Sequence, residues 1–350
     1  MPIVIYGAGI VGQALVKAGV KAIAFIDDNP KKKVCMRLPV LSLTRFKKLY
    51  KEAFIIISVA DIGDVVKSLD NYEWATCAHY LADYKPSTDF ERYAINTAVN
   101  CQSAFESGKL FLHSVDLIIT ERCSLKCKDC SNLMQYYEHP QDDDTTEVLA
   151  SIDRLFELVD EVNEVRVIGG EPFMNKDWHI ITRRLIKEPK LHYVVIYTNG
   201  TINPPQLLGV LSDKVLMLIT DYGKLSVNKD KFIKVCKDFY IPHYVQKVGG
   251  WTACSNIQYH KRSPAQNIAL FKSCCVHNLV NLSKGKLYRC PFAANFARLK
   301  PLLDMDHVDL SVASREGIER WLKREFIHAC EYCNGRPFGA PEIPPAIQRE

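Results

Sequence analysis

The sequence lacks any apolar run that approaches the roughly 18 residues needed to cross a bilayer as a helix. Its first residues, MPIVIYGAGIVG, contain neither a basic leader nor a small-residue cleavage site, so we expect no signal peptide and a cytosolic location. It also lacks an internal repeat of fixed period and a low-complexity tract. These absences argue against membrane-spanning, repeat and disordered classes and favour a folded globular protein.

Positive charge is in small excess. The formal net charge is +5, and the basic residues are scattered, most densely at Lys31–Lys33 and Arg45–Lys51. Such a surplus favours a solvated surface, permits an anionic substrate and does not call for nucleic acid. With 350 residues, of which 47% are hydrophobic and 24% charged, the chain has material for about two to three folded domains.

Short apolar runs alternate with helical stretches up to about residue 85. The runs are Ile3–Tyr6, Ala22–Asp27, Phe54–Val59 and Thr76–Leu81. Because this alternation is typical of a parallel, doubly wound sheet, we predict a small Rossmann-like domain over residues 1–85. Pro86 to Thr88 end the pattern, and a polar helical linker is expected over 86–110.

The same rhythm restarts and predicts a second α/β domain over 111–270. Its strands are predicted at Val115–Thr120, Val165–Ile168, Tyr193–Tyr197, Val215–Thr220 and Tyr244–Val248, and its helices at Thr145–Val159, Lys176–Ile186, Pro204–Leu211 and Lys229–Phe239. Repeated βα units of this kind curl into a full or partial barrel, here a partial (β/α)6 barrel. Functional residues are then expected at the carboxyl ends of the strands.

Cysteine is abundant, with 13 in the chain, and clustered cytosolic cysteines are more often metal ligands or catalytic groups than disulfides. Cys123, Cys127 and Cys130 form C-x3-C-x2-C directly after the first strand of the predicted barrel. Three thiolates on so short a loop can hold one face of an iron–sulfur cube. Because a cluster used only for electron transfer usually takes four cysteines, three leave one iron open for a substrate or cofactor.

A zinc site with His139 as the fourth ligand is the alternative interpretation of the three cysteines. Against it stands the turn Gly169-Gly170-Glu171-Pro172, which follows the second predicted strand at the same rim. Two glycines let the backbone approach a ligand closely, and the Glu171 carboxylate can accept hydrogen bonds from an ammonium group.

The two motifs together resemble those of the radical S-adenosylmethionine (SAM) superfamily, C-x3-C-x2-C followed by G-G-E-P. The resemblance implies that Cys123, Cys127 and Cys130 bind a [4Fe-4S] cluster whose fourth iron chelates the methionine moiety of SAM. It implies that Gly169, Gly170, Glu171 and Pro172 line that moiety. It further implies an external one-electron donor of flavodoxin or ferredoxin type and a 5′-deoxyadenosyl radical that takes hydrogen from the substrate, as in an oxidoreductase.

Two further turns match positions where family members contact the cofactor. Thr198-Asn199-Gly200 follows the third barrel strand and is expected near the ribose or adenine, and Asp221 follows the next strand. The alternatives stay open, because Asn-Gly is a common turn dipeptide and Asp221 suits a helix cap.

A second set of cysteines frames residues 271–350. Cys275 and Cys290 flank a predicted hairpin, His277–Leu282 with Lys286–Cys290, in the pattern C-x9-G-x4-C, and Cys330 with Cys333 adds a C-x2-C. The pattern resembles the shortened auxiliary-cluster module called Twitch rather than the longer SPASM module, which implies one auxiliary [4Fe-4S] cluster. Cys274 is adjacent to Cys275, so either can be the ligand, and a four-cysteine zinc site is the alternative. The end of the chain, Pro337 to Pro345, is expected to be irregular.

Cys254 follows a Gly-Gly-Trp loop at the presumed active face. A buried structural role is favoured for it, and donation of a hydrogen atom to a substrate radical is the catalytic alternative.

Gly7, Gly9 and Gly12 form G-x-G-x-x-G between a strand and a helix, and Asp27 ends the second strand. The fingerprint indicates a tight turn, a phosphate near the backbone and an acid suited to a ribose or sugar hydroxyl. Through IYGAGIVGQAL, FIDDNP and LPVLS, the segment resembles the small Rossmann domain of sugar-nucleotide acyltransferases, which implies nucleotide-sugar recognition. A domain that keeps the fold and binds nothing remains open.

These observations give one leading hypothesis and two others. The leading one is a radical SAM enzyme that oxidises or otherwise remodels a carbohydrate, expected to be nucleotide-linked. The second keeps the chemistry and takes a peptide substrate. The third is a metal-stabilised nucleotide-binding protein without enzymatic activity.

Overall fold

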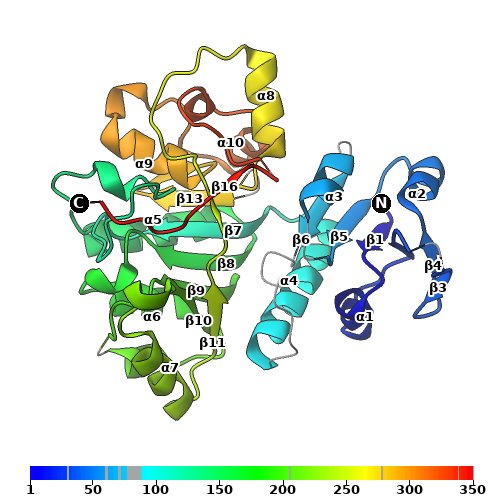
Figure 1. Cartoon of the computed structure of the whole chain (residues 1–350), viewed down its shortest axis with the longest axis horizontal. Helices are drawn as coiled ribbons and strands as arrows, with labels where there is room; N and C mark the ends of the chain where they lie inside the picture. Colours follow the sequence, from blue (N-terminus) through cyan, green and yellow to red (C-terminus); the bar gives the residue numbers. More distant parts are fainter. Residues whose placement is uncertain are drawn as a thin grey trace. The chain divides into compact units, whose positions relative to one another are not determined.

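The structure is a computed structural model and describes the chain apart from residues 30, 60, 61, 70, 71, 77–87, 205, 277, 278, 338 and 350. Its contacts fall into two compact units, Met1–Lys109 and Leu110–Glu350 (Figure 1). No helix in the described ranges is long and apolar enough to cross a membrane.

The first unit is built on one sheet whose described strands have the order β3-β4-β2-β1-β5-β6. All neighbours in it pair in parallel except β3 and β4, which are antiparallel. The strands are β1 (Ile3–Tyr6), β2 (Ala24–Ile26), β3 (Val34–Cys35), β4 (Leu38–Leu41), β5 (Phe54–Ile57) and β6 (Glu73–Thr76). The helices are α1 (Ile10–Lys17), α2 (Leu43–Leu49), α3 (Gly63–Ser68) and α4 (Thr88–Ser107).

The parallel sheet of this unit agrees with the predicted α/β class. The sequence placed the last strand at Thr76–Leu81, whereas β6 ends at Thr76 and residues 77–81 lie outside the described residues. Most of the predicted linker, residues 86–110, forms α4, whose contacts belong to the first unit. Phe105 of α4 stacks on Phe54 of β5 with ring centroids 4.6 Å apart.

The second unit begins with five parallel strands that follow one another in the sheet: β7 (Phe111–Ile118), β8 (Glu161–Ile168), β9 (Leu191–Thr198), β10 (Val215–Asp221) and β11 (His243–Lys247). The helices after them are α5 (Thr145–Leu158), α6 (Trp178–Ile186) and α7 (Lys229–Asp238). The later elements are β12 (Trp251–Thr252), α8 (Pro264–Ser273), β13 (Leu279–Ser283), β14 (Lys286–Tyr288), α9 (Pro291–Leu299), β15 (Val308–Asp309), α10 (Arg315–Leu322) and β16 (Glu342–Ile343).

Alternation along the strands separates two cores on the two faces of this sheet. Val115, Leu117 and Ile119 point to the core shared with α5, α6, α7 and α10. Ile118 points to the other core, which α9 shares. This is the period-2 pattern of strands that are covered on both sides, and it explains why they read as continuous apolar runs.

The hairpin of the last segment is part of the same sheet. β13 pairs in parallel with β7, on the side of β7 away from β8. The order continues through β14 to β15, which is the edge strand opposite β11. The sequence placed a boundary at residue 270, but the contacts do not divide the second unit there. Predicted residues 277 and 278 of the hairpin lie outside the described residues.

The helix predicted over Pro204–Leu211 is wrong in type. Its described part forms a 3-10 helix, Leu207–Val210. Gly209 inside this eight-residue segment disfavours an α-helix, which is consistent with a shorter, tighter element.

Candidate metal and cofactor site

The three cysteines of C-x3-C-x2-C lie on the loop that follows β7, as the sequence predicts. The sulfurs of Cys127 and Cys130 both act electrostatically on the Cys123 thiol, so the three cysteines lie near one another. Burial raises the pKa of Cys123 to about 12 and that of Cys130 to about 11. Buried thiols of this kind become thiolates when a cation binds them, which is the donor chemistry that an iron–sulfur cluster requires.

The turn after β8 is packed against this loop. A Cβ at Gly169 would lie 2.3 Å from the carbonyl oxygen of Thr120, and one at Gly170 would lie 2.2 Å from that of Arg122. The amide of Glu171 donates to the Arg122 carbonyl at 2.9 Å. Glycine is therefore needed here for the close approach of two backbones, whatever the turn also does toward a ligand.

Glu171 connects the ends of β8 and β9. Its carboxylate is fully buried and accepts hydrogen bonds from the Asn199 amide at 2.8 Å and the Thr198 hydroxyl at 3.0 Å. Burial raises the pKa of Glu171 to about 7, although these bonds oppose the shift. Pro172 begins a short 3-10 helix, Pro172–Met174, below it. The sequence expected Glu171 to receive an ammonium group; the structure gives it these protein partners, and the ammonium contact stays a prediction.

The Thr198-Asn199-Gly200 turn reaches the cysteine loop directly. The side-chain amide nitrogen Nδ2 of Asn199 lies 3.1 Å from the Ser124 hydroxyl and 3.7 Å from the Cys123 sulfur. Gly200 has φ +71°, a left-handed conformation that the turn requires. The sequence thus located this turn at the cysteine site, while its contact with a ribose or adenine remains a prediction.

Asp221, at the end of β10, pairs with Lys229 at 2.7 Å and accepts from the Gly223 amide at 2.9 Å. Asp221 is not a helix cap, because Tyr222 is the N-cap of the 3-10 helix Gly223–Leu225 and Asn228 is the N-cap of α7. A contact of Asp221 with the cofactor stays a prediction. Its neighbour Tyr222 is closer to the cysteines: burial raises the pKa of Tyr222, and the sulfurs of the three cysteines raise it further. Tyr222 therefore lies near the three cysteines.

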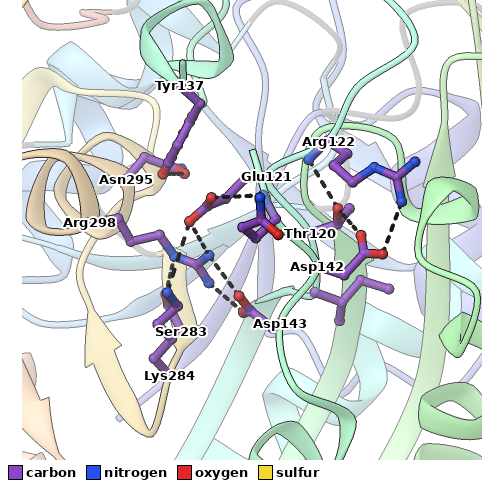
Figure 2. A network of polar contacts seen from close by, with 12 residues as sticks. Thr120, Glu121, Arg122, Tyr137, Asp142, Asp143, Ser283, Lys284, Asn295 and Arg298 are labelled. Carbon is purple, nitrogen blue, oxygen red and sulfur yellow. Dashed lines mark hydrogen bonds and ion pairs between the residues drawn. The ribbon is translucent and has the colours of Figure 1, made fainter. Parts of the chain in front are cut away.

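A buried ionic network supports the base of the loop (Figure 2). The Arg298 guanidinium, 5% exposed, donates to Asp143 at 2.5 Å and to Glu121 at 3.1 Å, and it also bonds Ser283 at 2.8 Å. Nearby, the Thr120 hydroxyl donates to Asp142 at 2.6 Å. Because Arg298 is in the last turn of α9, the network links that helix to the residues just before Cys123.

The second set of cysteines comes together around a pocket with apolar walls. Cys274, Cys290, Cys330 and Cys333 line it, and every pair of these four sulfurs interacts electrostatically. Cys290 is the N-cap of α9, with its sulfur 3.2 Å from the Ala293 amide. We call these four residues the tetrad. In the described part of the chain, no three His, Cys, Asp or Glu side chains meet tightly enough to hold a single metal ion.

The structure distinguishes the two adjacent cysteines. Cys274 lines the pocket, whereas Cys275 is not among the lining residues and donates a hydrogen bond to the Cys274 sulfur, which lowers the pKa of Cys274. The geometry therefore favours Cys274 over the predicted Cys275 as the ligand. Sequence spacing alone could not separate them.

Cys254 also lines this pocket and is buried. Its backbone carbonyl accepts from the Cys333 thiol at 3.4 Å, and its sulfur interacts electrostatically with Cys130. It is thus located between the two cysteine sets. The hydrogen-atom donor role that the sequence allowed for it stays a prediction. The side chain of His139, the alternative zinc ligand, is exposed.

In the first unit, the glycine loop has the geometry of its fingerprint. Gly7 has φ +108°, and a Cβ at Gly12 would lie 2.0 Å from the Gly7 carbonyl, so helix α1 packs tightly on the turn. Gly9 is the N-cap of α1. The Asp27 carboxylate, however, bonds the Ala8 amide at 3.0 Å and pairs with Lys32 at 3.0 Å. Its predicted contact with a sugar hydroxyl stays a prediction.

Comparison with known proteins adds the family of the second unit. The model of the radical SAM superfamily matches residues 117–228. A probable GTP 3′,8-cyclase of Methanocella arvoryzae (strain DSM 22066 / NBRC 105507 / MRE50) is 33% identical over 126 residues, 36% of this chain and 39% of that protein. The chain therefore matches about two fifths of the length of this curated relative.

Two solved structures are similar at low identity. BtrN in complex with AdoMet and 2-DOIA is 14% identical, with a TM-score of 0.41 over 64% of this chain and 93% of that one. Streptococcus suis SuiB bound to precursor peptide SuiA is 17% identical, with a TM-score of 0.32 over 58% of this chain and 47% of that one. At these scores neither likeness says anything about the substrate of this chain.

The chain has an α/β fold with largely parallel sheets, and its three-cysteine loop lies within the matched residues. Its second unit contains a radical SAM superfamily domain, over residues 117–228. The cofactors of this class of domain are SAM and a [4Fe-4S] cluster, and the three cysteines that lie near one another after β7 fit such a cluster.

Proposed function

We propose that the protein is a radical SAM enzyme of oxidoreductase type. The observation that carries this proposal is the convergence of Cys123, Cys127 and Cys130 at the carboxyl end of β7, beside the Gly169-Gly170 turn. When bound, the cluster and SAM supply reductive cleavage of the sulfonium and a 5′-deoxyadenosyl radical that takes hydrogen from the substrate. The electron is expected from an external flavodoxin or ferredoxin in a reducing cytosol.

The residues of the chain hold and shield this chemistry. The three sulfurs anchor the cluster, and the Asn199 amide steadies the Cys123 and Ser124 end of the loop. Glu171 fixes the relative positions of the β8 and β9 ends through its hydrogen bonds to Thr198 and Asn199. Tyr222 lies near the three cysteines and helps to exclude water, which a radical reaction requires.

The tetrad is proposed to hold the auxiliary [4Fe-4S] cluster. Four mutually close sulfurs give full thiolate ligation, which favours electron transfer over substrate binding. With Cys274 or Cys275 as the first ligand, the set is completed by Cys290, Cys330 and Cys333. A cluster there can take the electron left on a substrate radical when that radical is oxidised.

The proposed substrate is a carbohydrate, expected to be linked to a nucleotide. Support comes from the first unit, where the Gly7 turn and the start of α1 offer backbone N–H groups in the arrangement used for phosphates. A peptide is the second candidate, as in the second hypothesis drawn from the sequence. The domains are proposed as in the sequence prediction: a nucleotide-binding domain over 1–85, a linker over 86–110, the radical domain over 111–270 and the auxiliary module over 271–350. The contacts differ in two respects, since α4 belongs to the first unit and no division falls at residue 270.

Anaerobic reconstitution with iron counting, followed by a SAM cleavage assay, tests the activity. Release of 5′-deoxyadenosine with a reductant supports it; bound zinc and no cleavage would favour the non-enzymatic alternative. A panel of nucleotide sugars then tests the substrate through mass change or deuterium exchange. Cleavage without any change in the panel, together with capture of a precursor peptide, would replace the carbohydrate by a peptide.

A further inference from the structure

Residues 346–349, for which no motif predicts a role, pair with the cysteine loop. Cys127 and Gln348 form an antiparallel β-bridge. The Lys128 amide donates to the Ile347 carbonyl at 2.7 Å, and the Arg349 amide donates to the Lys126 carbonyl at 2.7 Å. The segment therefore runs along the loop that carries Cys127, more than two hundred residues away in the sequence (Figure 1).

The Gln348 side chain makes the most specific of these contacts. Its Oε1 accepts from the Lys126 amide at 2.8 Å, and its Nε2 donates to the Cys127 sulfur at 3.4 Å. Nε2 also donates to the Ala346 carbonyl at 2.7 Å, which fixes the orientation of the amide group. Cys127 is 8% exposed, so this hydrogen bond lies in a site with little water.

The preceding residues hold the segment against the rest of the site. β16 pairs with β12 through Trp251 opposite Ile343 and Thr252 opposite Glu342. A Cβ at Gly250 would lie 2.1 Å from a carboxylate oxygen of Glu342, so only glycine allows this approach. Trp251 in turn contacts Tyr222 edge to face, with ring centroids 6.0 Å apart. The segment is thus joined to Tyr222, which lies near the three cysteines.

We propose that residues 342–349 form a clasp that closes the cluster-binding loop, and that Gln348 is a positioning residue that stabilises the Cys127 thiolate through its amide. The inference rests on the proposed ligation of a cluster by Cys123, Cys127 and Cys130. Hydrogen bonds to cluster sulfurs favour the more negative, reduced state and so raise the reduction potential. A covering backbone also slows the entry of water, oxygen and chelators.

Two substitutions separate the hydrogen bond from the packing. Gln348→Glu keeps the acceptor for the Lys126 amide but removes the donor and adds a negative charge beside Cys127. Gln348→Met keeps the length of the side chain and removes both bonds. Gln206→Glu, at an exposed position, is the matched control for the added charge.

The measurements are the midpoint potential of each cluster, by redox titration with electron paramagnetic resonance (EPR), and the rate of iron loss to a chelator, both in the full chain. Gln348→Glu is expected to lower the potential of the cluster that responds to SAM, to leave the other cluster unchanged and to speed iron loss about tenfold. Gln348→Met should also lower the potential of this cluster and speed iron loss, but by less than Gln348→Glu does. Gln206→Glu should match the wild type.

Unchanged potential and iron loss in both Gln348 variants would overturn the clasp, as would equal shifts in both clusters. A Cys127→Ala variant distinguishes failure of the proposed cluster ligation from failure of the clasp. If it loses about 4 iron atoms per chain while the Gln348 variants behave as wild type, the ligation stands and the clasp fails. If it retains them, the proposed ligation fails and the clasp falls with it.

Discussion

The two cysteine sites of the second unit are assembled in opposite ways. Cys123, Cys127 and Cys130 lie on one loop after β7, so a local segment makes the site. The tetrad is gathered from separate places: the end of α8, the N-cap of α9 and the 3-10 helix His328–Glu331 with its following turn. A loop with three thiolates leaves a coordination position open, whereas four thiolates close the cluster. Under the proposed function, the first site is therefore expected to support chemistry and the second to transfer electrons.

Their surroundings differ in the same sense. Polar groups meet the three-cysteine loop, with Asn199 near Cys123 and Gln348 bonded to Cys127. The tetrad pocket has apolar side chains such as Phe271 and Phe292, with the guanidinium of Arg336 beside the sulfurs. A polar rim suits a cofactor with amino and carboxylate groups, and a dry, positively charged pocket suits storage of one electron.

Loss of a ligand from the loop should have the largest effect. Cys130→Ala is expected to remove about 4 iron atoms per chain and to abolish release of 5′-deoxyadenosine, because the cluster that binds SAM is lost. Cys290→Ala, the matched variant in the tetrad, should also lose about 4 iron atoms but keep SAM cleavage. Iron analysis and product chromatography measure both. Equal loss of cleavage in the two variants would break the distinction between the sites.

The next prediction concerns the two adjacent cysteines. Cys274→Ala should lose the auxiliary cluster, because Cys274 lines the pocket and its pKa is lowered by the Cys275 hydrogen bond. Cys275→Ala should keep the iron of both clusters. EPR spin counting of the reduced proteins compares the two variants. Loss of the auxiliary cluster in Cys275→Ala, with its retention in Cys274→Ala, would make Cys275 the ligand.

The ionic network joins the two regions, since α9 begins beside Cys290 and has Arg298 in its last turn. Arg298→Met leaves Asp143 buried without its cation and leaves Glu121 with only Lys284, at 4.0 Å. Breaking a buried pair of this kind costs about 3–5 kcal/mol. We expect a lower midpoint of urea unfolding for the second unit and easier loss of both clusters. Lys234→Met, which breaks an exposed pair with Asp238, is the control and should cost under about 0.5 kcal/mol. Similar effects of the two variants would contradict the stabilising role of the buried network.

The smallest effect is expected at Arg336. Burial opposes its charge, but the neighbouring cysteine sulfurs, Cys275 first, raise the pKa of Arg336, so the guanidinium stays positive beside the tetrad. Arg336→Gln should lower the reduction potential of the auxiliary cluster alone, because a cation stabilises its more negative state. Arg336→Lys should restore most of the potential. A redox titration that shows no shift, or a shift in the other cluster, would contradict this.

The sequence predicts what is local. The strands β7 to β11 and the helices α5 to α7 follow from apolar runs, and the cysteine loop and the Gly169-Gly170 turn follow from motifs of eight residues or fewer. The contribution of Gln348 has no local signal, since its partner Cys127 is distant in sequence and β-bridges depend on the tertiary fold. The same holds for the pairing of β13 with β7.

Other differences between the sequence prediction and the structure arise because polar side chains form hydrogen bonds with one another. Glu171 and Asp27 have the residue type that a ligand contact requires, but both are bonded to neighbouring amides and side chains in the structure. The choice between Cys274 and Cys275 depends on which sulfur faces the pocket, and only packing decides it.

The most direct test of the central claim uses the anaerobically reconstituted full chain. Iron is counted, the protein is reduced, and EPR spectra are recorded before and after SAM is added. The account predicts about 8 iron atoms per chain and two signals, of which SAM changes one and leaves the other unaltered. Bound zinc in place of iron, or spectra in which SAM changes neither signal, would contradict it.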